Sequence, residues 1–222
     1  MHDRSRLPAL PNRYPNYDVL AKRNGPSWNA KTREVIAGRL AVTAMPLFFS
    51  ASEFQLVETI AARIVPQPPT RPPVPVAALV DRKLHADVAD GYRPGGMPRQ
   101  REAWRRGLRA LEAEALAAFH RPLAELSEAT QDELLRHAAS GELKAADWGN
   151  MRCDDFFKHR LLHDVVLAYY AHPTAWDEIG WGGPASPRGY VRLDFNDRDP
   201  WEAAEAEPGR EQDAARINRH VR

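Results

Sequence analysis

The segment that most constrains the fold is DDFFKHRLLHDVVLAYYAHP, residues 154–173, which is apolar around more than half of a helical circumference. Phe157, Leu161 and Val165 recur at helical spacing on one face, and further apolar side chains widen that face. A helix that is apolar over most of its surface must be covered by other elements. The segment therefore predicts a central helix that ends at Pro173.

Further stretches carry apolar stripes at helical spacing, and none has the convincing alternation of a strand. The clearest is SASEFQLVETIAARIVP, where Ser50 and Glu53 are spaced as a capping box and Pro66 stops the helix. The sequence thus predicts an all-α fold. We expect a compact bundle of five or six helices, with an extended N-terminal arm and a Gly/Pro/Trp-rich C-terminal loop region.

Composition divides the chain into three parts. We expect an extended arm with a short helix over residues 1–46, a helical domain over 47–192, and an acidic tail over 193–222. Residues 1–40 carry eight Lys/Arg against three Asp/Glu, whereas residues 194–222 carry eight Asp/Glu against five Arg. The two ends are therefore expected to attract each other, to wrap a partner, or to remain solvated tails.

Several classes of protein are disfavoured by simple totals. The net charge of the 222 residues is +1, which gives no argument for a nucleic-acid or membrane partner. The single cysteine, Cys153, excludes an intrachain disulfide scaffold. No apolar run approaches the roughly 20 residues of a membrane span. We expect no direct membrane insertion, and we recognise neither a Sec nor a Tat signal at the start.

Two patterns raise the question of catalysis. His159 and His163 are four residues apart on the central helix, with Asp164 beside them, and histidines at this spacing can share a metal. The glutamate of the H-E-x-x-H motif is absent, so ordinary helix histidines are the competing interpretation. The sequence GWGGPA loosely matches a dinucleotide fingerprint, but it follows a helix, and its proline removes an amide that the phosphates would need.

Arginines crowd another helix. Arg101, Arg105 and Arg109 form a row of residues four apart. Such a row can bind phosphate or an acidic partner, although a solvated helix face is the default interpretation.

The most suggestive group is aromatic and surrounds GWGGPASPRGY, residues 180–190. Amphipathic aromatic side chains near an arginine are typical of a binding hot spot. The competing interpretation is that they cap the core of this chain. We take the following residues as candidates for partner binding: Tyr170, His172, Trp176, Trp181, Pro184, Arg188 and Tyr190.

An ordered series of segments resembles the gluconate 2-dehydrogenase subunit 3 family. The series begins with FFSASEFQLVETIAARIVPQ, continues through PVAALVDRKL, WRRGLRALEAEA and FHRPLAELSEATQDELL, and ends with FFKHRLLHDVVLAYYAHPTAWDEIGWGGPASPRGY. It runs from about Phe48 to Tyr190. The resemblance implies a small subunit without a cofactor or catalytic residues of its own. Its partner would be a large flavoprotein of the glucose-methanol-choline (GMC) oxidoreductase type, which holds FAD and oxidises a sugar, a sugar acid or a glycoside.

The family also implies a cytochrome c subunit that often accepts the electrons. Many members carry a Tat signal, whereas this chain begins with a basic, proline-rich arm. We therefore expect a cytoplasmic complex, or a periplasmic one if the partner carries the signal. Two other roles remain open: a maturation or export chaperone that leaves the active flavoprotein, and a stand-alone helical metalloenzyme that uses His159 and His163.

Overall fold

The computed structural model describes residues 12–69, 71–186, 189 and 198–221. Within these ranges the chain is all-α, as predicted, and forms no strand; an isolated parallel bridge joins Trp28 and Ser186. The described part contains more helical segments than the five or six expected. It divides into a helical unit, residues 42–169, and a terminal unit built from the segments on either side, residues up to 41 and from 170 onward.

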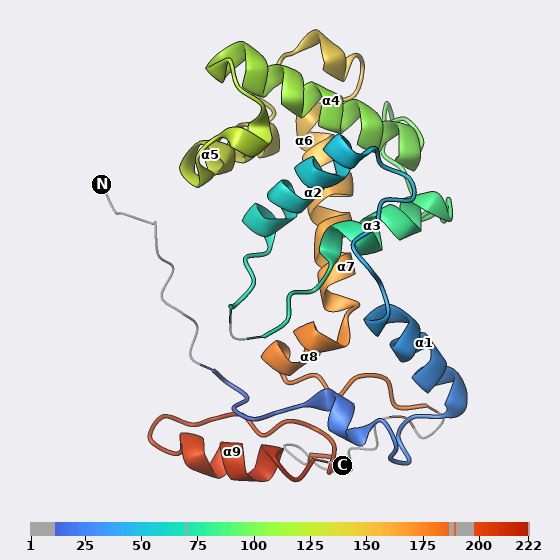
Figure 1. Ribbon diagram of the computed structural model, residues 1–222, viewed down its shortest axis with the longest axis vertical. Coiled ribbons are helices and arrows are strands. Elements are labelled where there is room, and N and C mark those ends of the chain that lie inside the picture. The colour runs from blue at the N-terminus through green and yellow to red at the C-terminus, as the bar shows by residue number, and fades with distance from the viewer. Residues whose placement is uncertain (1–11, 70, 187–188, 190–197, 222) are drawn as a thin grey trace. The chain divides into compact units, whose positions relative to one another are not determined.

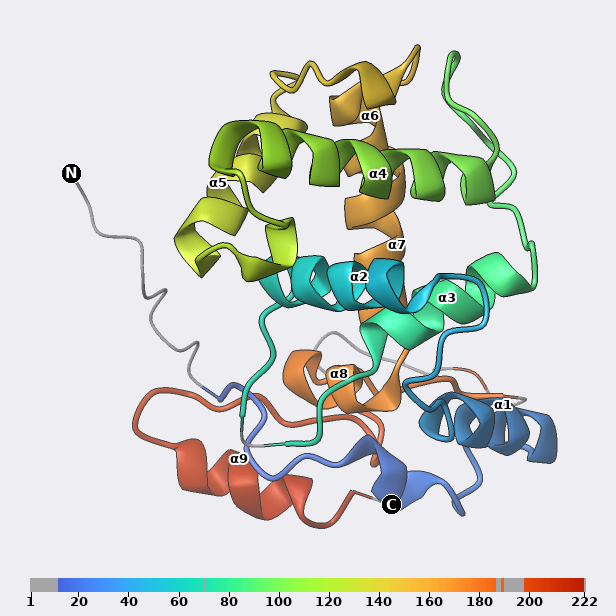
Figure 2. The ribbon, with the colours of Figure 1, turned by 45° about the horizontal axis from the view of Figure 1, so that its top comes forward.

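The helical unit holds most of the helices (Figure 1). They are, in chain order, α2 (Ala51–Ile64), α3 (Val76–His85), α4 (Gln100–Phe119), η2 (Leu123–Glu125), α5 (Glu128–Ala139), η3 (Ala146–Trp148), α6 (Cys153–Phe156), the π-helix η4 (Phe157–Leu162) and α7 (His163–Tyr170), whose last residue belongs to the terminal unit. Helices α4 and α5 pack against α6 and η4, and α2 packs against α3, α4 and α5 (Figure 2).

Helix α2 begins where the sequence predicted it. The hydroxyl of Ser50 accepts a hydrogen bond from the amide of Glu53, and the Glu53 carboxylate accepts one from the amide of Ser50. This capping box satisfies two of the amides that have no partner inside the helix. The stripe that follows is buried, with Val57 and Ile60 wholly inaccessible to solvent.

The predicted central helix is also present, and α6, η4 and α7 form it without a break. Phe156, Leu161 and Val165 have no exposed surface. The middle of the helix is a π-helix, in which hydrogen bonds run from i to i+5 and widen the turn. Side chains four residues apart across this segment therefore lose the alignment that they have in an α-helix.

The terminal unit contains the short helix that the sequence predicted in the arm. Its elements are η1 (Val19–Lys22), α1 (Ala30–Leu40), α8 (Pro173–Ile179) and α9 (Glu211–Asn218). Asn29 caps α1 by accepting a hydrogen bond from the amide of Thr32. The core of the unit joins residues from both ends of the sequence: Tyr17, Val19, Trp28, Ile36, Trp176, Trp201 and Val221.

Polar contacts also join the arm to the tail. Arg13 donates to Glu205 over 2.8 Å, and the amide of Ala206 donates to the carbonyl of Arg13 over 2.7 Å. The Tyr17 hydroxyl donates to the carbonyl of Trp201 over 2.9 Å. Of the three behaviours that the uneven charge allowed, attraction between the two ends is thus present in the structure. The boundaries of the two packing units therefore differ from those of the compositional parts 1–46, 47–192 and 193–222.

Candidate functional site

The glycine-rich segment after α8 lies against the chain's own arm. The amide of Asn29 donates to the carbonyl of Ser186, and the amide of Ser186 donates to the carbonyl of Ser27, each over 2.9 Å. These bonds form the isolated bridge of the terminal unit. GWGGPA, residues 180–185, follows helix α8, and its residues 181–185 are irregular, whereas a dinucleotide fingerprint follows a strand and opens a helix.

Two glycines of this segment permit close approach of its backbone to aromatic rings. Gly183 has φ +68°, and a Cβ there would lie 2.9 Å from the ring of Trp176 and 3.4 Å from that of Trp28. Gly180 has φ +62°, and a Cβ there would lie 2.3 Å from the ring of Tyr14. Both conditions, positive φ and absent space, restrict these positions to glycine. The segment is therefore held in one conformation by rings of the terminal unit.

The structure places two of the predicted partner-binding residues inside this unit. Trp176 is 1% exposed and belongs to the core, and its indole N–H donates to the carbonyl of Tyr170 over 2.7 Å. His172 is buried and precedes α8, where its ring nitrogen accepts a weak bond from the amide of Thr174. In this structure Trp176 packs against Trp181 and Gly183 of the loop, His172 lies at the start of α8, and neither residue presents a surface. That is the alternative in which these residues cap the chain's own core.

Other residues of the set face outward. Tyr170 is 40% exposed and Trp181 is 42% exposed, and Ile179, between them in sequence, is 45% exposed. We call these three side chains, Tyr170, Ile179 and Trp181, the aromatic surface, after the two aromatic residues among them. The Trp181 ring packs edge-on against buried Trp176, with the ring centroids 4.6 Å apart. The sequence did not indicate that Ile179 is exposed, because an aliphatic residue near the end of a helix is usually part of the core.

The remaining candidates lie at the margin of the described segment. Pro184 is half-buried. Arg188 and Tyr190 lie outside the described residues. The proposal that they anchor a partner therefore stays a prediction.

The histidine pair is not brought together as a metal site. His159 lies 3.9 Å from Asp155, whereas the group whose ligand atoms fall within 4.8 Å of one another, among the described residues, consists of Asp90, His163 and Asp164. The π-helix accounts for this separation, because it contains His159, ends one residue before His163 and widens the turn between them.

That group of three is already neutralised by the chain's own cations. The ammonium of Lys83 lies 2.6 Å from Asp90 and 2.9 Å from Asp164, and Arg160 lies 3.4 Å from Asp90. Asp164 is buried and also accepts the indole N–H of Trp104 over 2.7 Å. A buried carboxylate with this many partners is a structural junction. A metal ion would have to displace Lys83, so the geometry favours the interpretation as ordinary helix residues.

A match to a known family model identifies the family of this chain. The family model described as gluconate 2-dehydrogenase subunit 3 matches residues 51–183, more than half of the chain. The chain belongs to the gluconate 2-dehydrogenase subunit 3 family. The matched residues carry every helix from α2 to α8. The family name implies that the chain is a subunit of a dehydrogenase complex.

Neither a curated protein nor a solved structure matches the chain significantly. Among the described residues, no helix has both the length and the apolar character that crossing a bilayer requires.

Proposed function

We propose that this chain is a non-catalytic small subunit that binds and stabilises a large FAD-dependent oxidoreductase of the GMC type. The match to the subunit 3 family over residues 51–183 is the observation that carries the proposal. On this proposal the flavin and the catalytic residues belong to the partner, which oxidises a sugar, a sugar acid or a glycoside. A cytochrome c is the electron acceptor that we expect in the assembled complex.

The aromatic surface is the site that we propose for contact with the large subunit. Interface hot spots are enriched in Trp and Tyr, and they bind best when their conformation is fixed before binding. Trp181 meets both conditions, because its ring is held against Trp176 and its amide donates to the Trp176 carbonyl over 3.0 Å. A partner that covers Tyr170, Ile179 and Trp181 would remove three exposed apolar side chains from water.

The proposal is tested by co-expression of the tagged chain with a neighbouring GMC-type flavoprotein gene, and of each protein alone. Affinity capture is followed by a visible spectrum of the captured material. The expected result is a yellow complex of the two proteins, with the flavoprotein insoluble or inactive when expressed alone. Capture of a colourless chain without a partner would contradict the proposal.

The contact surface is tested by Trp181→Ala in the same capture experiment. We expect a loss of about 2 kcal/mol in binding, roughly thirtyfold in affinity, because a central aromatic anchor is removed. Tyr92→Ala is the matched control, since Tyr92 is an exposed aromatic residue of the helical unit, 80% exposed. Equal capture of both variants at low protein concentration would exclude Trp181 as an anchor.

A maturation chaperone remains the alternative role within the same family. It would bind the newly made flavoprotein and leave once the enzyme is active. The two roles differ in whether this chain remains with the active enzyme, so captured material must also be assayed for dehydrogenase activity with a sugar panel and an artificial electron acceptor.

A further inference from the structure

Helix α4 carries a cavity lined mainly by arginines, and the proposed function does not use it. Arg101, Arg105 and Arg109 form a row along the helix, and Arg106 lies beside it. Together with Phe48 and Glu102 these arginines line a cavity of about 380 Å³. Residues four apart on a helix are separated by about 6 Å along its axis, so the row extends over about 12 Å.

The cavity lining has a large excess of positive charge. It contains four guanidinium groups and one carboxylate. Glu102 pairs with Arg106 over 2.6 Å, and Asp147, outside the lining, lies 3.4 Å from Arg109. Arg101 and Arg105 have no carboxylate partner among the described residues. These two guanidinium groups are therefore the ones available to an external anion.

Both groups are positioned by one aromatic ring. The guanidinium carbon of Arg101 lies 4.9 Å from the centroid of the Phe48 ring, and that of Arg105 lies 4.5 Å from it. Arg105 also donates to the carbonyl of Phe48 over 3.2 Å. Stacking on an aromatic face leaves the edges of the planar guanidinium free for two parallel hydrogen bonds to an oxyanion.

The ring is itself fixed by a buried carboxylate. Asp81 of α3 is wholly buried, and it accepts hydrogen bonds from three successive amides, those of Leu47 (2.6 Å), Phe48 (3.1 Å) and Phe49 (2.8 Å). The Phe49 ring then packs edge-on against Trp104 in the core. The aromatic residue against which the two guanidinium groups lie is therefore positioned by the fold itself, which lowers the entropy lost on binding.

We propose that this cavity binds an extended acidic segment of a partner protein, with Asp or Glu at alternating positions. Alternate residues of an extended chain point to the same side and are about 6.7 Å apart, close to the rise of about 6 Å between neighbouring arginines of the row. Successive carboxylates can thus meet Arg101 and Arg105, and a third would reach Arg109 by displacing Asp147. A single small oxyanion would engage only part of a row of this length.

The identity of the partner rests on the proposed function: in a dehydrogenase complex the segment would belong to the large subunit. The chemistry of the cavity does not depend on that identity. Binding of an acidic peptide and capture of the flavoprotein are therefore measured separately. A complex that forms although the peptide does not bind would contradict only the inference about the cavity. Peptide binding without a complex would contradict only the proposed function.

The test uses the full chain and a short fluorescein-labelled peptide in which Glu and Ser alternate, followed by fluorescence anisotropy. We expect salt-sensitive binding, because the contacts are ionic. Arg101→Gln/Arg105→Gln should weaken it at least roughly tenfold, since charge-assisted hydrogen bonds are lost. Arg101→Gln alone, at an exposed position, should weaken peptide binding less than the double variant does. This single variant shows whether the loss in the double variant comes from the missing charges rather than from misfolding.

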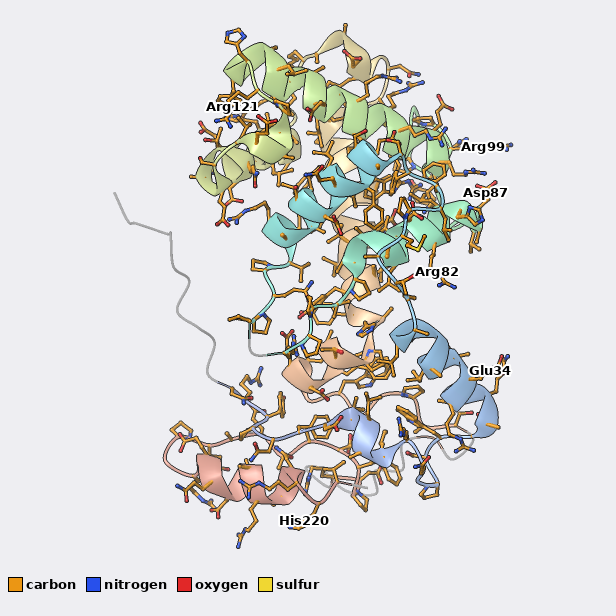
Figure 3. The ribbon with its side chains drawn as sticks, viewed as in Figure 1. Glu34, Arg82, Asp87, Arg99, Arg121 and His220 are labelled. Carbon is orange, nitrogen blue, oxygen red and sulfur yellow. The ribbon has the colours of Figure 1, made fainter. Side chains whose placement is uncertain are left out.

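The control is Arg82→Gln/Arg121→Gln, which removes the same charge from two arginines of the helical unit that do not line the cavity; both are labelled in Figure 3. It should bind the peptide as the unaltered chain does. A peptide with Gln in place of Glu should not bind, and one with its Glu residues contiguous should bind more weakly. The inference is overturned if the unaltered chain does not bind the alternating peptide, if the cavity variants bind it normally, or if inorganic phosphate displaces it as effectively as unlabelled peptide.

Discussion

At the scale of single residues, the least expected feature is a buried lysine in the arm. Lys22 has no exposed surface, and its ammonium makes no hydrogen bond within the described residues. It lies 5.6 Å from the centroid of the Trp28 ring and 5.8 Å from that of Trp201. Burial lowers the pKa of Lys22 from 10.5 to about 8, although Glu202 and Asp199 act in the opposite direction.

This lysine predicts a rise in stability with pH. Below pH 8 both the folded and the unfolded chain hold the proton, and the full cost of burying the charge is present. Between pH 8 and 10.5 the unfolded chain retains a proton that the folded chain has released, so the free energy of unfolding increases. Lys22→Met should remove this slope and stabilise the terminal unit near neutral pH by up to about 3 kcal/mol.

Urea unfolding followed by tryptophan fluorescence measures the effect at about pH 7 and about pH 9.5. Lys144→Met, at an exposed position, is the control and should keep the slope of the unaltered chain. The same pH slope in Lys22→Met and in the unaltered chain would contradict the account.

The sequence did not indicate the environment of Lys22, because a basic residue in a proline-rich arm normally faces water. Its burial depends on Trp28 and Trp201, which are far apart in sequence and belong to no periodic pattern. The row Arg101, Arg105 and Arg109 was visible as a pattern. The contact of this row with the Phe48 ring was not visible, because the carboxylate of Asp81, in α3, positions Phe48.

At the scale of elements, the crossing of α4 and α6 depends on a glycine. A Cβ at Gly107 would lie 2.2 Å from the ring of Phe156, which is wholly buried and packs edge-on against Trp104. Glycine costs about 1 kcal/mol in a helix relative to alanine. Here it is required because the two helices approach closely.

Gly107→Ala should therefore destabilise the helical unit by roughly 1–2 kcal/mol, since overpacking costs more than the gain in helix propensity. Gly38→Ala in α1 is the control, because no atom lies within 4 Å of the added Cβ, and it should be neutral or slightly stabilising. Chemical denaturation of both variants measures the difference. Equal stability of Gly107→Ala and the unaltered chain would show that Phe156 relaxes without cost.

Sequence patterns anticipated the elements unevenly. The capping box at Ser50 and Glu53, the apolar stripe of α2 and one buried face of the central helix followed from local rules. The rest of the central helix is less covered than predicted, because Leu162 is 37% and Leu167 52% exposed. The π-helix η4 did not, because the apolar stripe of the central segment was also compatible with an α-helix. The pairing of Trp28 with Ser186 was likewise invisible, because it joins two irregular segments.

At the scale of the whole molecule, the two ends of the sequence build one packing unit. Trp201 lies in its core and is 2% exposed, and Glu205 and Ala206 bond to Arg13. The proposal that the arm and the tail wrap a partner must accommodate this mutual packing. Residues outside the described ranges, including Arg188 and Tyr190, stay as predicted contacts.

Trp201→Ala should open the terminal unit selectively. Removing a buried tryptophan costs about 3–5 kcal/mol, and Trp201 contributes to a small core. Limited proteolysis with mass spectrometry should reveal early cleavage within residues 12–41 or 198–221, while residues 42–169 persist. Trp181→Ala, at an exposed tryptophan of the same unit, should retain normal resistance. Uniform degradation of both units in Trp201→Ala would contradict a selective opening of the terminal unit.

We propose that this member of the subunit 3 family remains bound to an active flavoprotein. Size-exclusion chromatography with light scattering, carried out on the co-expressed proteins at submicromolar concentration and with activity assayed across the fractions, tests it most directly. The account predicts that dehydrogenase activity, flavin absorbance and this chain elute together at the mass of a complex. Active, flavin-containing enzyme that elutes without this chain would contradict the account and favour the chaperone role.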